Sequence, residues 1–386
     1  MLIGFDCRII RDKNPAGISW VVLESLRKIL SLDRKNEYLL IFDSIEIKDY
    51  VLHYLRHIKK QYRVMIVPFS LLGVKNLIHL PAVLESKNID VYYLPYYFTT
   101  PFHKKSYKVV LTVFDLIHFF YPKLKMGLGR KLFHLFKLAP YLVLRRADKI
   151  ITISINTSRD LIHMFRVPSR KIKMIYVGVS ERFRKVDMVL AKKLMREKYS
   201  IQKNYILYVG RNEPHKNIKA LIGAYALLPQ AVRDSHTLVL AGKEEERYAQ
   251  SIHDFVNKLH ITENVVFTGY VDESDLPYVY SGASVFVFPS FYEGFGMPVL
   301  EAMACEVPVI CSDSSCLPEA GGNAALYFHP EDVRDLTSKL YEVLSNSMKR
   351  EDMIKKGKVQ VRKFTWFNSI SQLIECLEQV VHGDMK

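Results

Sequence analysis

The feature that most constrains the fold is a regular alternation of short β-rich runs with longer helical patterns along the chain. The first half contains "LIGFDCRI", "YLLIFDS", "RVMIVPF", "DVYYLPY", "KVVLTVFD", "KIITIS" and "KIKMIYVGV". After a polar stretch, the series restarts with "YILYVGR", "TLVLAGK", "NVVFTGYV", "VFVFPS", "VPVICSD" and "AALYFHP". Strands that alternate with helices indicate parallel sheets covered by helices on both faces. We therefore predict an α/β fold with two doubly wound, Rossmann-like sheets.

The length of 386 residues suits two domains of similar size. We predict one domain over residues 1–180 and a second over residues 181–364. The last stretch, 365–386, has the apolar spacing of a helix that could cross back onto the first domain. Because such sheets collect ligands at the carboxyl ends of their strands, two facing sheets would leave a ligand cleft between them.

The formal net charge of +15 is concentrated in residues 101–150, which contain eleven lysines and arginines against two aspartates. These charges interleave with aromatic residues and leucines, which is typical of a surface that meets anionic lipid headgroups and equally of a solvated amphipathic helix. The same charge raises the alternative of a basic nucleic-acid-binding protein. No nucleic-acid-binding motif accompanies it, so we expect no nucleic-acid partner.

No apolar run approaches the roughly 20 residues that a membrane-spanning helix needs. Asp6 and Arg8 interrupt what would have to be the apolar part of a signal peptide. We expect a cytoplasmic protein, peripheral on the inner face of the membrane if the 101–150 segment binds lipid. Five cysteines without C-x-x-C spacing suggest reduced thiols, and no His/Cys or Asp-x-Asp pattern suggests a metal site.

The stretch "FPSFYEGFGMPVLEAMACEVPVICSD" has a strand, a glycine-rich loop and a helix in succession. Pro298 suits the first turn of that helix, where N–H groups have no intrahelical partner. Gly294 and Gly296 lie in the loop, where a bare backbone can approach a ligand closely.

Two carboxylates flank this loop, since Glu293 precedes it and Glu301 lies about one turn into the helix. We expect both to point into the same crevice. A carboxylate accepts hydrogen bonds from two adjacent hydroxyls, so the pair suits recognition of sugar or ribose diols. The alternative is that Glu293 caps the helix and Glu301 makes a surface ion pair.

The stretch "LYVGRNEPHKN" places Arg211 at the end of a strand and Lys216 just before a helix. Two cations at this position form an anion site suited to a diphosphate. They could offset the charge that develops on a departing diphosphate as a metal ion would, so we expect metal-independent chemistry. The alternative is a solvated loop with ordinary basic residues.

Together, "GRNEPHKN", "FPSFYEGFGMPVLEAMACEVPV" and "LPEAGGNAALYF" resemble the family 4 retaining glycosyltransferases (glycosyl transferases group 1), whose two-domain architecture is called GT-B. The resemblance implies that Arg211 and Lys216 hold the diphosphate of a nucleotide sugar. It implies that Glu293 faces the transferred sugar and that Glu301 binds the ribose hydroxyls. The residues whose backbone would contact that sugar are Gly294, Phe295, Gly296, Met297 and Pro298.

The resemblance extends to Gly17, in a glycine loop that opens the first helix and would face the donor phosphates and the acceptor. It is broken at Phe114, since many relatives carry a histidine there, before an aspartate that corresponds to Asp115. His118 could replace the missing histidine if the chain turns helically after Asp115, because four residues make about one turn. A packing or hydrogen-bonding role is the alternative for His118.

The family therefore implies a retaining glycosyltransferase for cell-surface polysaccharide, such as lipopolysaccharide. It also implies that the N-terminal domain, 1–180, binds the acceptor and that the C-terminal domain, 181–364, binds the nucleotide sugar. It would move a hexose, with mannose as the first expectation, from GDP-mannose or a UDP-hexose to a glycan or lipid-linked acceptor. The donor is a substrate, and no cofactor is expected. A nucleotide-sugar epimerase of the same fold is the alternative enzyme, and it would convert the donor without any acceptor.

Overall fold

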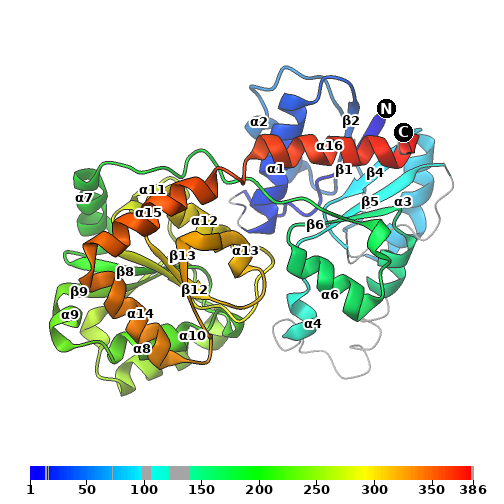
Figure 1. Cartoon of the computed structure of the whole chain (residues 1–386). Coiled ribbons are helices and arrows are strands. Elements are labelled where there is room, and N and C mark those ends of the chain that lie inside the picture. The colour runs from blue at the N-terminus through cyan, green and yellow to red at the C-terminus, as the bar shows by residue number, and fades with distance from the viewer. Residues whose placement is uncertain (14, 16, 72, 98–105, 122–139, 384–386) are drawn as a thin grey trace. The chain divides into compact units, whose positions relative to one another are not determined.

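The structure is a computed structural model that describes the chain except for residues 14, 16, 72, 98–105, 122–139 and 384–386. It divides into two compact units (Figure 1). The first unit comprises Met1–Leu116, Lys125–Gly178 and Thr365–Lys386. The second comprises Ile117–Leu124 and Val179–Phe364.

The first unit is built on a parallel sheet with the strand order β3-β2-β1-β4-β5-β6-β7. Its strands are β1 (Leu2–Asp6), β2 (Glu37–Phe42), β3 (Arg63–Ile66), β4 (Val91–Leu94), β5 (Lys108–Val113), β6 (Lys149–Thr152) and β7 (Ile172–Met174). The order reverses direction between β1 and β4, which is the switch point of a doubly wound sheet. Each β-rich run predicted in this half coincides with one of these strands, although their ends differ by one or more residues.

The helices of the first unit are α1 (Ile18–Leu32), α2 (Ile45–Tyr54), α3 (Val74–Ser86), α6 (Ile155–Phe165) and α16 (Trp366–His382), with the short η2 (Ser169–Lys171). The C-terminal helix α16 packs against α1, β4 and β5 of this unit. The Thr365 side chain caps α16 by accepting from the Asn368 N–H, at 3.2 Å. Near the other end of α16, Asn36 Nδ2 donates to Glu378 Oε1 at 3.0 Å. The last helix of the sequence therefore completes the first unit.

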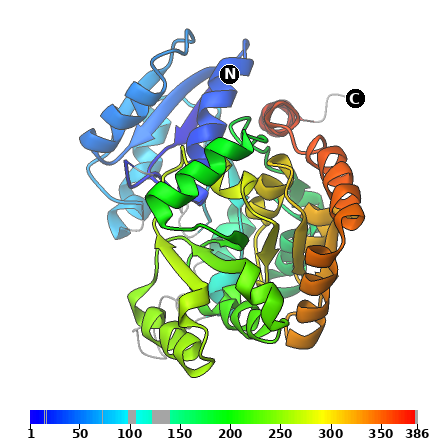
Figure 2. The same cartoon turned by 90° about the vertical axis from the view of Figure 1, so that its left-hand side faces the viewer.

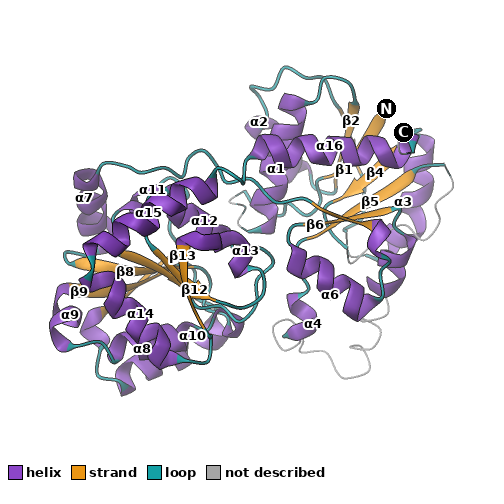
Figure 3. Cartoon of the chain, viewed as in Figure 1, coloured by secondary structure: helices purple, strands orange, loops and turns teal. Residues whose placement is uncertain are grey.

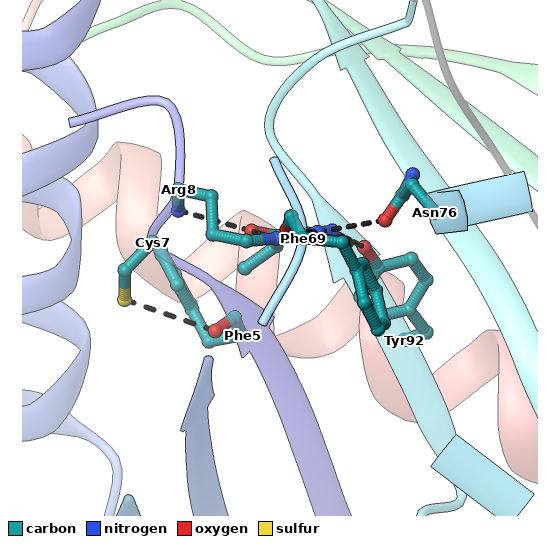
Figure 4. Close-up of polar contacts among 7 residues, drawn as sticks. Phe5, Cys7, Arg8, Phe69, Asn76 and Tyr92 are labelled. Atoms are coloured by element: carbon teal, nitrogen blue, oxygen red, sulfur yellow. Dashed lines mark hydrogen bonds and ion pairs between the residues drawn. The ribbon is translucent and has the colours of Figure 1, made fainter. Parts of the chain in front are cut away.

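A buried ion pair with several further bonds lies at the carboxyl end of β1 (Figure 4). Asp6 and Arg8 are both buried, and the Arg8 Nη2 to Asp6 Oδ2 distance is 2.6 Å. Arg8 also donates to Asn76 Oδ1 at 2.7 Å, to Tyr92 Oη at 3.3 Å and to the Phe69 carbonyl at 3.5 Å. Burial disfavours the Arg8 charge, but the Asp6 carboxylate more than offsets this and raises the pKa of Arg8. Through these bonds, Arg8 links the end of β1 to the segment from Phe69 to Asn76 and to β4.

The second unit repeats the plan with the strand order β10-β9-β8-β11-β12-β13, again entirely parallel. Its strands are β8 (Asn204–Val209), β9 (His236–Ala241), β10 (Val265–Gly269), β11 (Val285–Phe288), β12 (Val309–Ser312) and β13 (Ala325–Phe328). Each β-rich run predicted in this half also coincides with a strand, although their ends differ by one or more residues. The prediction of two doubly wound parallel sheets is confirmed.

Two layers of helices cover the second sheet (Figures 1 and 2). In one layer, α8 (Ile218–Ala226) packs on α10 (Glu246–Lys258) and α14 (Val333–Ser345). In the other layer, α12 (Met297–Ala304) packs on α11 (Leu276–Ser281), α13 (Leu317–Gly321) and α15 (Ser347–Val361). The remaining elements of this unit are α4 (Ile117–Phe120), α7 (Met188–Tyr199), η3 (Pro214–Lys216), α9 (Gln230–Ser235), η4 (Thr262–Asn264) and η5 (Gly322–Ala324).

Helices cover both faces of each sheet (Figure 3). This explains why the central strands are apolar along their length and do not alternate between apolar and polar residues. All four residues of β4 and of β11 are buried. Phe114, which stands where many relatives carry histidine, is buried as well, directly after β5.

Within the part of the chain that the structure describes, no helix is long and apolar enough to cross a membrane. Part of the predicted lipid-facing segment, 101–150, lies outside the described residues, including Lys123, Lys125, Arg130 and Lys131. Its binding to an anionic membrane surface stays a prediction.

Candidate active site

The candidate site lies at the carboxyl ends of β8 and β11, which are neighbours in the second sheet. The two loops that follow these strands are tied together by backbone and side-chain bonds. Phe291 N–H donates to the His215 carbonyl at 2.8 Å. Asn217 Nδ2 donates to the Pro289 carbonyl at 3.1 Å and to the Pro330 carbonyl at 2.7 Å. Asn217 has φ +55°, a left-handed conformation that asparagine tolerates better than most residues.

This arrangement brings together Lys216 and Glu293, which are 77 positions apart in the sequence. Lys216 Nζ lies 2.8 Å from Oε1 and 2.9 Å from Oε2 of Glu293, so the ammonium contacts both carboxylate oxygens. Nζ also lies 5.4 Å from the ring centroid of Phe288, a cation–π distance. The Lys216 side chain is 18% exposed and the largely buried Glu293 side chain 11% exposed. One alternative was that Glu293 caps the helix. In the structure its carboxylate contacts Lys216 instead.

The peptide of Glu293 is held by the turn after β12. Ser315 Oγ accepts from the Glu293 N–H at 3.3 Å and donates to the Glu293 carbonyl at 2.8 Å. The buried thiol of Cys316 donates to the same carbonyl at 3.2 Å. Sequence reasoning missed both residues, although their position after a strand of the second sheet was a signal for a site role.

The predicted sugar-contacting loop, Gly294 to Pro298, leads from β11 into α12. Gly296 precedes α12 with φ +92°, and a Cβ at this position would lie 2.7 Å from Leu317 Cδ2. The positive φ therefore favours glycine here, and a Cβ would also require the Leu317 side chain to shift. Phe295 is buried and its ring packs edge-on against Phe364, at a centroid distance of 5.4 Å. The Phe295 side chain thus anchors the loop.

Arg211 follows β8 as predicted, but its side chain is 58% exposed. Its Nη1 lies 3.0 Å from Glu245 Oε1 and 3.9 Å from Glu213 Oε1. Burial raises the pKa of Glu213, and Lys216 and Arg211 partly offset that effect. The two predicted phosphate-binding cations therefore each pair with a different carboxylate in this structure.

His118 lies in α4, so the chain does turn helically after Asp115. This segment belongs to the second unit, where the ring of Phe120 lies 4.6 Å from that of Tyr292, and the ring of Tyr121 lies 5.8 Å from that of His215. Burial, together with Lys216 and His118, lowers the pKa of His215 to about 2. A catalytic role of His118 stays a prediction.

Glu301 has different surroundings from Glu293. It lies in α12 and accepts a hydrogen bond from Tyr280 Oη at 2.9 Å. Burial raises the pKa of Glu301 to about 7, although the Tyr280 hydrogen bond and Arg182 lower it and Glu273 raises it. Arg182 forms its own ion pair with Glu273. Tyr280, Arg182 and Glu273 were not singled out from the sequence.

Gly17 belongs to the first unit and precedes α1 with φ +55°. A Cβ there would meet nothing within 4 Å, so the positive φ alone favours glycine. Among the described residues, no group of three or more His, Cys, Asp or Glu could hold a metal ion.

Known families match both halves of the chain. Residues 39–183 match the family described as "Glycosyltransferase Family 4", and residues 191–360 match "Glycosyl transferases group 1". The chain belongs to glycosyltransferase family 4. The resemblance on "GRNEPHKN" and "EGFGMPVLEAMA" is thereby confirmed at the level of the family.

Its similar relatives include bacterial mannosyltransferases. The chain is 35% identical to the O-antigen chain mannosyltransferase B of Escherichia coli over 231 residues, which is 59% of this chain and 60% of that protein. It is 31% identical to the O-antigen chain mannosyltransferase RfbU of Salmonella typhimurium over 233 residues, 60% of each protein. The chain thus spans less than two thirds of the length of these relatives.

Solved structures share the fold at low identity. A crystal structure of Anabaena HepE in complex with UDP and glucose has a TM-score of 0.74 at 19% identity and covers 98% of this chain and 100% of its own. WaaG, a glycosyltransferase involved in lipopolysaccharide biosynthesis, has a TM-score of 0.69 at 15% identity and covers 99% and 100%. These structures show that the fold of this family 4 member is the two-sheet α/β fold called GT-B.

Proposed function

We propose that the chain transfers a hexose from a nucleoside diphosphate sugar to a hydroxyl of a glycan or lipid-linked acceptor during synthesis of a cell-surface polysaccharide. The family supports the reaction class, and the O-antigen mannosyltransferases among its relatives support mannose as the sugar and GDP-mannose as the first donor to try. UDP-hexoses are the second choice. Retention of the anomeric configuration and independence of metal ions are part of the proposal.

The observation that carries the proposal is the contact between Lys216 and Glu293. An ammonium and a carboxylate stand side by side at the carboxyl ends of neighbouring strands, where such sheets bind ligands. A nucleotide sugar presents a diphosphate and a set of hydroxyls side by side. The ammonium suits the first group and the carboxylate suits the second.

The contact also implies an exchange of partners when the donor binds. In the structure the Lys216 ammonium contacts both oxygens of Glu293. A diphosphate would compete with the Glu293 carboxylate for this ammonium. Once the ammonium has turned to the phosphate, the carboxylate is free to accept hydrogen bonds from sugar hydroxyls. Donor binding would in this way prepare both groups at once.

Charge stabilisation would be the main contribution of the protein to the reaction. As the bond between the anomeric carbon and the diphosphate breaks, negative charge grows on the leaving oxygen, and Lys216 and Arg211 would offset it. Glu293 would orient the sugar for same-face attack by the acceptor hydroxyl, whose proton would pass to the departing diphosphate. Glu301 would hold the ribose by accepting hydrogen bonds from its hydroxyls.

A panel of nucleotide sugars tests this proposal. GDP-mannose, UDP-glucose and UDP-galactose are each added to the protein, and the melting temperature is measured, because a ligand that binds only the native state stabilises it. We expect a rise of several degrees with one donor and, with a glycan or lipid-linked acceptor, transfer that persists in EDTA. Conversion of the donor sugar without an acceptor would instead indicate an epimerase. Absence of both binding and transfer across the panel would contradict the proposal.

A further inference from the structure

Glu293 lies in a loop, so neither a helix nor a strand fixes its position. Both of its backbone polar groups bond instead to the turn after β12. A single hydroxyl, Ser315 Oγ, accepts from the Glu293 N–H at 3.3 Å and donates to the Glu293 carbonyl at 2.8 Å. A serine hydroxyl has one proton to donate and lone pairs to accept, so it can make both bonds together. Ser315 thus clamps one peptide segment across 22 positions of sequence.

The backbone of Ser315 shows that this clamp has a cost. Its φ of +57° lies in the left-handed region, which disfavours residues with a Cβ. Glycine would occupy the same conformation without that cost. A serine in such a position indicates that its side chain has a use, and the two bonds to Glu293 supply one.

We propose that Ser315 is a positioning residue that aims the Glu293 carboxylate through the Glu293 peptide. The inference rests on the proposed role of Glu293 in orienting the sugar. The neighbouring Cys316 thiol supports the same carbonyl from a buried position, at 3.2 Å. Loss of the Ser315 hydroxyl would let the loop shift, and a displacement of about 1 Å at a reacting group can reduce turnover on the order of 100-fold.

The Ser315→Gly variant separates positioning from folding. It removes the hydroxyl and also relieves the left-handed strain, which compensates for the greater freedom of glycine in the unfolded chain. We expect kcat to fall by about 10- to 100-fold, with the donor Kd changed less than about threefold and the melting temperature near that of the wild type. Ser315→Ala removes the same hydroxyl but retains the strain, and it should show the same loss of kcat.

Ser314→Ala is the matched control, since it deletes the same group from the adjacent, equally partly buried residue. Its kcat should remain within about twofold of wild type. A double variant, Ser315→Gly with Glu293→Gln, tests the route of action. If Ser315 acts through Glu293, the double variant should be no slower than Glu293→Gln alone, because residues that act as a unit are not additive.

A second measurement tests the clamp by protein stability and does not depend on measuring turnover. The coupling between Lys216 and Glu293 is obtained from the unfolding of Lys216→Met, Glu293→Gln and the double variant, first with Ser315 intact and then in the Ser315→Gly background. The coupling should fall by at least half in that background. An unchanged coupling, an unchanged kcat in Ser315→Gly, or strictly additive losses with Glu293→Gln would each overturn the proposal. Failure of wild type to use any nucleotide sugar would contradict the proposed function instead, and the coupling would still decide the role of the clamp.

Discussion

Asp6 with Arg8 in the first unit and Glu293 with Lys216 in the second are ion pairs of the same kind at the same place, the carboxyl end of a parallel sheet. They differ in exposure and in the bonds left to make. Arg8 and Asp6 have fully buried side chains, and Arg8 has further acceptors in Asn76, Tyr92 and a backbone carbonyl. Lys216 and Glu293 remain partly exposed.

The difference teaches how to distinguish a structural ion pair from one that can work on a ligand. A buried guanidinium whose donors are occupied cannot exchange partners without exposing an unpaired charge, which is costly. A partly exposed ammonium that contacts one carboxylate can move to a phosphate at little cost, since water and the ligand replace the contact. Position in the fold alone does not make this distinction.

The largest expected effect concerns the structural pair. Arg8→Met should reduce the free energy of unfolding by about 3–5 kcal/mol, because it leaves the buried Asp6 carboxylate without its counter-ion. Unfolding in urea, followed by circular dichroism, measures it. Arg11→Met, which removes a nearby exposed arginine, should change stability by less than about 0.5 kcal/mol. Equal small changes in both variants would mean that Arg8 does not hold the first unit together.

The next effect concerns the pair of Lys216 and Glu293. Substitution of either residue should lower turnover, but the two substitutions should change the affinity for a nucleoside diphosphate in opposite directions. Lys216→Met should lower turnover by about 100-fold or more and weaken binding of a nucleoside diphosphate, since it removes the ammonium. Glu293→Gln should lower turnover too, yet bind the nucleoside diphosphate about 3- to 10-fold more tightly, because about 1 kcal/mol of competing ion pair is lost.

Isothermal titration with GDP and UDP measures both affinities. Lys219→Met is the control, because Lys219 is exposed on α8 and lies three positions after Lys216 in the sequence. It should leave affinity within about twofold of wild type. Weaker diphosphate binding by Glu293→Gln would show that the carboxylate and the phosphate do not compete for Lys216.

The smallest effect concerns Glu301, a carboxylate whose hydrogen-bond partner is the Tyr280 hydroxyl instead of a cation. Burial raises its pKa to about 7, above the ordinary value of 4.5. Between these pH values the folded protein holds a proton that the unfolded chain has released, so this group destabilises the fold as the pH rises from 4.5 to 7. Glu301→Gln removes the titration and should gain about 1–3 kcal/mol relative to wild type across that range.

Chemical denaturation at about pH 5 and about pH 8, on either side of most of this titration, measures the difference. Glu246→Gln, at the start of α10, is the control because Glu246 is exposed. It should show the same stability difference from wild type at both pH values. A Glu301→Gln variant with no pH-dependent gain would mean that Glu301 titrates with an ordinary carboxylate pKa.

Much of the fold was predictable because it depends on local pattern. Each predicted β-rich run coincides with a strand, since a strand that is covered on both faces must be apolar along its length. The loop and helix around Gly296 and Pro298 were predictable for the same reason, because glycine and proline restrict the backbone locally. The sequence also placed Lys216 and Glu293 at strand ends.

Contacts between distant segments were not predictable. Glu293 and Glu301, eight positions apart, have different neighbours, whereas Glu293 and Lys216, 77 positions apart, share a contact. The Ser315 clamp was missed because its residue types are common in any loop. Nothing in the sequence around Arg8 distinguished it from an exposed arginine.

The sequence by itself determined the alternation of strands and helices, the two sheets and the chemical types of the site residues, because these follow from periodicity and from residue identity. Only the tertiary structure decided which charges are paired, which are buried and which remain accessible. The strand order β8-β11-β12 brings Lys216, Glu293 and Ser315 to one edge of the sheet. Electrostatic and hydrogen-bond energies depend on distance and burial, and chain connectivity alone fixes neither.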